Sequence, residues 1–456
     1  MPIDARYVAL SHTWGVKEER KKTMPLLLKG NLPARTFGIP WIDLTQTFQD
    51  AITITRNIGI PYVWIDSLCI VQDDREDWAK EAARMASVYK YAYLVIAATS
   101  SKNGDDGCLR PREPSFDLTG SLNESFYVQR EISHRTIIEW QAESIAMPLL
   151  DRAWCFQERL LASRILHYTE CEMMWECQEE LWCECQLIKF DNPSTTKLET
   201  FKLAHAAAVA STKPEIRATS WHKVVREYSQ RALTFGTDRL PGISGIAREI
   251  AVPELGRYLA GLWERKFPGA LLWSSRGGVV DRPDVLPRPA QYLAPTWSWA
   301  SIISAVRIDQ VLITESKVTV CRVIEVTCAP TTADLYGHVE DGWLRISGPT
   351  IAATLKRTDR KYENSRYDVF FEIPDLVAPG KEATVSFKSD IELTEAAISV
   401  LILFIQVRSF GTMYDRAEGI VLVQSKMHTG RWERIGIFLG WDLDLSQMKE
   451  RDFMIV

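Results

Sequence analysis

The sequence lacks any apolar run long enough to cross a bilayer. Its longest such run, Ala396 to Val407, has about 12 residues, whereas a spanning helix needs about 20. The many β-branched residues of this run favour a buried strand instead. The N-terminal residues also lack a basic segment followed by a long apolar one, so we expect no signal peptide. These absences predict no membrane partner and a cytoplasmic location.

The chain has no block of like charges. Its 54 Lys and Arg and 59 Asp and Glu residues give a formal net charge of −5. A protein that neutralises many phosphates needs a basic face, so we expect no nucleic-acid partner. Neither Gly-x4-Gly-Lys-Ser/Thr nor Gly-x-Gly-x-x-Gly occurs, and any nucleotide-driven partner would therefore be a separate chain.

The nine cysteines do not form an extracellular disulfide pattern, which favours a reducing compartment. Zinc sites usually contain a Cys-x2–4-Cys pair, and the one dense cysteine cluster has none, so we expect no metal site. Its members should pack as small apolar side chains near Trp175 and Trp182. The cluster comprises Cys171, Cys177, Cys183 and Cys185.

Short apolar runs alternate with helical patterns in the N-terminal part of the chain. The runs Tyr7–Ser11, Tyr62–Ile65 and Leu94–Ala98 are continuous, which is typical of strands buried on both faces. Helical periodicity occupies Leu44–Arg56 and Asp77–Tyr91 between them. This order predicts an α/β domain with a parallel sheet and right-handed crossovers.

The remaining chain changes from helical to β patterns, and its 456 residues allow two or three domains. We expect domains at residues 1–190, 191–310 (mainly helical, with a Trp-rich segment) and 311–456 (β-rich). The predicted helices are Asp151–Arg164, Phe201–Ala210, Ala218–Ala232 and at least one within Leu240–Trp263. The predicted strands are Phe126–Val128, Thr136–Glu139, Lys317–Thr327, Gly342–Ile346, Ala397–Gln406, Gly419–Val423 and Arg434–Leu439.

Tryptophan is abundant, with 16 residues, and indicates aromatic-rich cores or a ligand pocket. Trp297 and Trp299 flank Ser298, a spacing that places both indoles on one side of a strand. Such an arrangement is more typical of a core than of a cofactor site.

Three sequence blocks follow one another in the N-terminal part of the chain. They are YVALSHTWG at Tyr7–Gly15, YVWIDSLCIVQDD at Tyr62–Asp74, and DRAWCFQER at Asp151–Arg159, which is followed by Trp175–Cys177. In their order and spacing these blocks resemble the heterokaryon-incompatibility (HET) domain of filamentous-fungal allorecognition proteins. Three later stretches resemble the C-terminal extension of many such proteins: Leu240–Ala247, Tyr258–Trp263 and Ala294–Ser301.

The resemblance implies a fold similar to the Toll/interleukin-1 receptor (TIR) domain, which is flavodoxin-like. It also implies a role in non-self recognition and regulated cell death, with a homo-oligomer or a partner incompatibility protein. Several TIR domains cleave NAD with the glutamate of a Trp-x-x-Glu pattern, here Trp78 to Glu81. On this reading NAD is a substrate, no cofactor is required, and Glu81 is the catalytic residue.

The strand ends predict where a ligand would bind, because ligands of open parallel sheets lie beyond the carboxyl ends of the strands. Ser11, His12, Trp14 and Gly15 follow the first strand, and Asp66 and Ser67 follow the second. If the two strands are neighbours, these polar groups line one crevice with an aromatic wall. That combination suits a ribose or a nicotinamide.

Each of these residues also has a structural interpretation. Glu81 can form a solvated i,i+3 pair with Arg84, and Asp66 can hold the Ser11–Gly15 turn. Arg152 and Arg159 can bind an anion or form ion pairs that fix a buried helix. The alternatives for the whole protein are a non-catalytic interaction module and a stand-alone enzyme with an aromatic pocket for a small metabolite.

Overall fold

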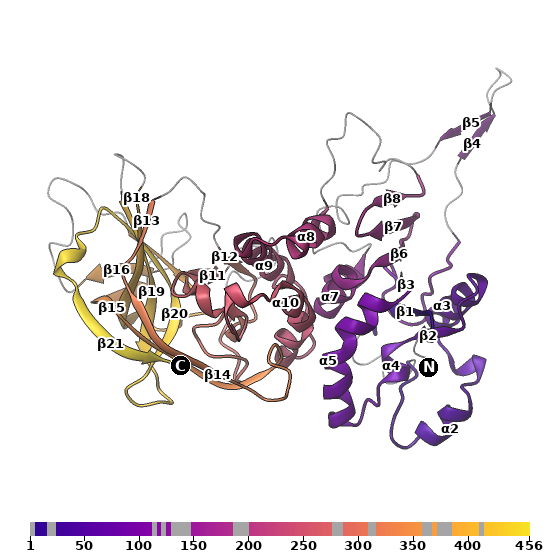
Figure 1. Cartoon of the computed structure of the whole chain (residues 1–456), viewed down its shortest axis with the longest axis horizontal. Coiled ribbons are helices and arrows are strands. Elements are labelled where there is room, and N and C mark those ends of the chain that lie inside the picture. The colour runs from indigo at the N-terminus through magenta and orange to yellow at the C-terminus, as the bar shows by residue number, and fades with distance from the viewer. Residues whose placement is uncertain are drawn as a thin grey trace. The chain divides into compact units, whose positions relative to one another are not determined.

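A computed structural model describes most of the chain as two compact units (Figure 1). The first unit contains Met1–Ala210 and Arg231–Leu233, and the second contains Ser211–Gln230 and Thr234–Val456. In the described ranges no helix combines the length and the apolarity needed to cross a membrane. The described residues are 5–15, 24–111, 116–119, 125–128, 147–185, 200–275, 286–308, 316–357, 367–371, 385–409 and 415–456.

The first unit is built on a six-stranded sheet with the order β2-β1-β3-β6-β7-β8. The first four strands of this order are parallel, and β7 and β8 add an antiparallel hairpin at one edge. The predicted parallel α/β sheet is therefore confirmed, and each predicted strand ends within one residue of its observed end. The strands are β1 (Tyr7–Ser11), β2 (Tyr62–Trp64), β3 (Leu94–Ala97), β6 (Arg164–Tyr168), β7 (Met173–Cys177) and β8 (Leu181–Cys183).

Helices cover both faces of this sheet because its strands are apolar on both faces. Val8 and Leu10 of β1 belong to a core that includes Phe48 and Ile54 of α3 (Gln46–Asn57). The intervening Ala9 belongs to a second core.

That second core also contains Met85 and Tyr89 of α5 (Arg75–Tyr91) and Cys155 of α7 (Ala153–Leu161). Asp74 begins α5 by accepting hydrogen bonds from the N–H groups of Glu76 and Asp77, at 3.0 and 3.4 Å.

Further elements of the first unit lie outside the six-stranded sheet. The hairpin of β4 (Phe116–Thr119) and β5 (Ser125–Val128) confirms the strand predicted at Phe126–Val128. Helix α8 (Phe201–Ala210) has the predicted bounds. The strand predicted at Thr136–Glu139 lies outside the described residues.

Residues 231–233, which follow α9 in the sequence, bond to the residues at the start of α7. Ala232 donates its N–H to the Asp151 carbonyl at 2.7 Å and accepts the N–H of Ala153 at 3.0 Å. Arg231 donates to the Leu150 carbonyl, and its guanidinium lies 4.9 Å from the ring centre of Phe156. Residues 231–233 therefore complete the first unit from a position beyond α9 in the sequence.

The second unit begins with α9 (Pro214–Tyr228) and α10 (Ser244–Ile250). The apolar periodicity across Leu240–Trp263 predicts at least one helix, and α10 confirms it, although the helix stops at Ile250. Pro253 disfavours helix at the preceding residue, and Gly256 has a φ of 73°, so the chain turns there instead. Two short strands follow, β9 (Tyr258–Leu259) and β10 (Leu262–Trp263).

Trp297 and Trp299 lie in the core, as their spacing suggests, but not on a strand. Trp299 begins a 3-10 helix that Ser298 caps, and both indoles are fully buried. The Trp299 Nε1–H donates to the Gly261 carbonyl at 3.0 Å, and a Cβ on Gly261 would lie 2.5 Å from that nitrogen.

The second unit ends in the predicted β-rich module, a nine-stranded and almost wholly antiparallel sheet. Apolar side chains of its central strands form a core around Ile402, Phe404, Val421 and Phe438. The strands are β13 (Ser316–Thr319), β14 (Arg322–Pro330), β15 (Val339–Arg357), β16 (Tyr367–Phe371), β17 (Val385–Ser389), β18 (Ala397–Ser409), β19 (Asp415–Gln424), β20 (Trp432–Trp441) and β21 (Lys449–Ile455).

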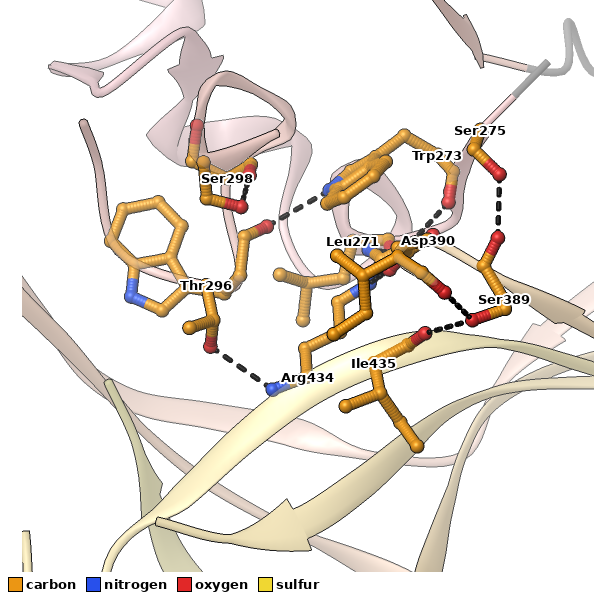
Figure 2. A network of polar contacts seen from close by, with 12 residues as sticks. Leu271, Trp273, Ser275, Thr296, Ser298, Ser389, Asp390, Arg434 and Ile435 are labelled. Carbon is orange, nitrogen blue, oxygen red and sulfur yellow. Dashed lines mark hydrogen bonds and ion pairs between the residues drawn. The ribbon is translucent and has the colours of Figure 1, made fainter. Parts of the chain in front are cut away.

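A buried polar network connects this sheet to β11 (Trp273–Ser275) (Figure 2). Arg434 of β20 donates from Nε to Asp390 Oδ2 at 2.8 Å and to the carbonyls of Leu271 and Trp273. Its guanidinium carbon lies 3.5 Å from the ring centre of Trp273. Burial raises the pKa of the Asp390 carboxyl although Arg434 opposes the rise. The Trp-rich segment and the sheet thus share one set of buried charges.

Candidate functional site

The ends of β1 and β2 lie side by side, as the proposed crevice requires. The two strands are parallel, with Tyr7 opposite Tyr62 and Ala9 opposite Trp64. The chain therefore leaves both strands at the same edge of the sheet, which is where parallel α/β proteins bind ligands. This geometric prediction is confirmed.

Asp66 holds the two strand ends together. Its Oδ2 accepts a hydrogen bond from Trp14 Nε1 at 2.9 Å, and its Oδ1 accepts the N–H of Ser67 at 2.6 Å. His12 Nε2 lies 3.7 Å from Oδ1. Gly15 then leaves this turn with a φ of 83°, a left-handed conformation that glycine adopts readily. The expectation that Asp66 stabilises the Ser11–Gly15 turn is confirmed.

Three buried polar atoms at this edge have no hydrogen-bond partner among the described residues. They are His12 Nε2, Thr13 Oγ1 and Ser67 Oγ. Burial lowers the pKa of His12, and Arg152 lowers it further while Asp66 opposes, so the imidazole is neutral near pH 7. Buried polar groups are nearly always satisfied by protein, water or ligand. This edge therefore offers both donors and acceptors to a bound molecule.

A buried charged cluster lies directly behind the strand end. Ser11 Oγ donates to Glu158 Oε2 at 2.5 Å, and Arg152 donates to the carbonyl of His12. Burial raises the pKa of Glu158 to about 7, although the bond from Ser11 and the charge of Arg152 oppose the rise. Glu158 can thus hold or release a proton near neutral pH.

Glu81 occupies a different position from the strand ends. On α5 its Oε1 pairs with Arg84 at 3.2 Å, as the i,i+3 interpretation predicts. No hydrogen bond in the described part of the chain connects Glu81 with Ser11, His12 or Asp66. It nevertheless lies close enough to Cys69 that its charge adds to burial and to Asp66 in raising the pKa of that thiol.

The described residues contain no hydrogen bond between Ser11 and His12. The Ser11 hydroxyl donates to Glu158 instead, so any base for this hydroxyl would be the Glu158 carboxylate and not the His12 imidazole. Burial raises the pKa of the Cys69 thiol, which disfavours its thiolate.

A second buried cluster fixes α7 to the sheet. Arg159 donates to both carboxylate oxygens of Glu176, at 2.7 and 3.1 Å, and His167 Nε2 lies 3.2 Å from Glu176 Oε2. Burial alone would raise the pKa of Glu176, but Arg159 and His167 hold it far below its usual range. Arg159 is thus engaged in an ion pair, as the ion-pair interpretation predicts, whereas Arg152 donates to the backbone carbonyl of His12.

Residues 7–158 match the family model described as Heterokaryon incompatibility protein (HET). These residues are a HET domain. No curated protein and no solved structure matches the chain. The match begins with β1 and ends at Glu158, so every candidate residue of the edge lies within it.

Glu158 is the functional candidate that sequence reasoning missed. It lies 147 residues from Ser11 in the chain, and the only signal was its place at the end of the third block. The sequence of that block predicts a buried helix fixed by ion pairs, and nothing in it connects Glu158 with the first strand.

Proposed function

We propose that this protein is a heterokaryon-incompatibility effector that acts in the cytoplasm in fungal non-self recognition and ends in regulated cell death. Its HET domain would bind NAD at the edge formed by β1 and β2 and hydrolyse it, as in TIR domains. The HET match supports the biological role. The three buried polar atoms without hydrogen-bond partners carry the proposal of a ligand at this edge.

The edge has groups suited to a nicotinamide riboside. The Thr13 and Ser67 hydroxyls and the neutral His12 ring can bond ribose hydroxyls, and Asp66 orients the Trp14 indole for stacking. Hydrolysis breaks the bond between ribose C1′ and the nicotinamide nitrogen, which leaves neutral nicotinamide and an oxocarbenium-like sugar that water attacks. A carboxylate beside C1′ stabilises that charge.

Two carboxylates are available for this step. Glu81 has the Trp-x-x-Glu spacing, and its ion pair with Arg84 must break before it can contact a ligand. Glu158 is already bonded to Ser11 at the strand end, with a pKa of about 7. We assign the catalytic role to Glu81, and the experiment below includes Glu158 as the direct rival.

The test is nicotinamide release from NAD by the purified full chain, followed by chromatography over a range of protein concentrations. Glu81→Gln should abolish release, while Glu76→Gln, an exposed residue of the same helix, should leave it unchanged. Loss with Glu158→Gln but not with Glu81→Gln would move the catalytic role to Glu158. No turnover by the wild type at any concentration would refute NAD hydrolysis.

A non-catalytic association module is the second candidate, and one observation favours it. Phe37 and Ile42 are 94% and 86% exposed, and the nearby Trp41 is 44% exposed. Monomeric proteins rarely expose several large apolar side chains together. Such exposed groups therefore indicate an interaction site. If the HET domain signals by self-association, Phe37→Ser with Ile42→Ser should lower the mass measured by light scattering at high concentration. A wild type that stays monomeric would contradict self-association.

A further inference from the structure

We propose that Glu172, Cys183 and Cys185 form a zinc-binding site on the hairpin of β7 and β8. The site lies beyond residue 158, where the HET match ends, and shares no residue with the edge discussed above. It reverses the expectation, drawn from cysteine spacing alone, that this cysteine cluster binds no metal.

The register of the hairpin brings the three side chains together. Met174 pairs with Cys183, and the ladder continues past β8 because Glu184 donates its N–H to the Met173 carbonyl at 3.1 Å. Glu172 therefore lies opposite Cys185, whose N–H donates to Glu172 Oε2 at 3.0 Å. Side chains alternate along a strand, so Cys183 and Cys185 lie on the same face as Glu172.

The donor atoms lie close enough for one ion. One oxygen of Glu172 and the two sulfur atoms are all within 4.8 Å of one another. The two sulfurs are 3.1 Å apart, whereas tetrahedral zinc with bonds of about 2.3 Å separates two thiolates by about 3.8 Å. A side-chain adjustment of less than about 1 Å therefore opens the site to its bound geometry.

The chemistry of the donors selects the metal. Two thiolates and one carboxylate are a set that Zn²⁺ accepts, and hard cations such as Mg²⁺ and Ca²⁺ do not use sulfur ligands. Glu172 is 1% exposed and Cys183 is 2% exposed, while Cys185 is half-buried. Three protein ligands leave the fourth position to water. Binding releases the thiol protons, so affinity should rise with pH.

Disulfide formation between the same two sulfur atoms would compete with metal binding. Two thiols 3.1 Å apart can lose two hydrogen atoms to an oxidant and close to a disulfide of about 2.05 Å. A disulfide would remove both thiolates and leave no metal site. The test therefore measures the metal and the redox state on the same sample.

The experiment treats the purified, reduced full chain with a chelator, adds Zn²⁺, removes the excess, and measures bound metal by elemental mass spectrometry. We expect one zinc per chain, and Co²⁺ in its place should give the near-ultraviolet absorption of thiolate-to-cobalt charge transfer. Cys185→Ser and Glu172→Gln should weaken binding by more than the 10–100-fold that loss of a second-shell partner costs. Cys183→Ala tests the third ligand and keeps an apolar group in its core cluster.

Cys171→Ser is the matched control, because Cys171 is exposed and neighbours Glu172 in the sequence without belonging to the three donors. Its zinc content should equal that of the wild type. Any of three results would overturn the proposal. The wild type binds no zinc, Cys185→Ser binds zinc as tightly as the wild type, or Cys171→Ser loses its zinc. A disulfide between Cys183 and Cys185 that persists after treatment with reductant and zinc, so that no metal binds, would also overturn the proposal.

Discussion

Replacement of Glu158 by Gln tests the electrostatics of the strand end. Glu158 is buried and keeps a proton up to a pKa of about 7, whereas an ordinary glutamate loses it near 4.5. Between these values the folded chain binds a proton that the unfolded chain has lost. Stability therefore falls as the pH rises through this window.

The magnitude follows from the two pKa values. A change from 4.5 to about 7 corresponds to about 3 kcal/mol of unfolding free energy. Gln has no proton to lose and can still accept the Ser11 hydroxyl through its amide oxygen. The free energy of unfolding of Glu158→Gln, relative to wild type, should therefore rise by about 3 kcal/mol between about pH 4.5 and pH 8.

Urea unfolding of the full chain at several pH values measures this difference. Groups common to both proteins, such as His12 and His167, cancel when the variant is compared with the wild type at each pH. Glu179→Gln is the control, because Glu179 is exposed in the turn between β7 and β8. Curves of Glu158→Gln and wild type that stay parallel across the window would refute the assignment of a raised pKa to Glu158.

Three further predictions concern the buried contacts. Glu176→Gln should lower the free energy of unfolding by about 3–5 kcal/mol, because it leaves the Arg159 charge buried without its carboxylate. Because the pKa of Glu176 is depressed, this stabilisation is present above about pH 4.5 and lost as the pH falls, so the two proteins should converge in acid. Arg434→Met should cost about 3–5 kcal/mol through the uncompensated Asp390, and calorimetry of the second unit would measure it. Gly261→Ala should cost about 2–4 kcal/mol, because φ is 95° and the new Cβ meets Trp299; an unchanged melting temperature would contradict this.

Local patterns predicted the parallel sheet, because continuous apolar runs such as Tyr7–Ser11 are typical of strands that are buried on both faces. The meeting of His12, Trp14 and Asp66 followed from topology alone, since parallel neighbours end at the same edge. Periodicity predicted the helix within Leu240–Trp263 but not its end at Ile250, which is followed by Pro253 and a turn.

Other features depend on packing that no local pattern encodes. The bond between Ser11 and Glu158 exists only because α7 packs against the end of β1. The convergence of Glu172 with Cys185 depends on the register of a hairpin, which spacing between cysteines does not contain. Sequence reasoning thus located the edge of the sheet but not the charges behind it.

The return of residues 231–233 to the first unit has a practical consequence for anyone who expresses the HET domain alone. A fragment that stops at residue 158, where the family match ends, or at Ala210 leaves the Asp151 carbonyl and the Ala153 N–H without the backbone partner Ala232. It also exposes the Phe156 ring that Arg231 covers. A fragment that keeps these contacts must extend through Leu233, and it therefore also contains α9, which belongs to the second unit.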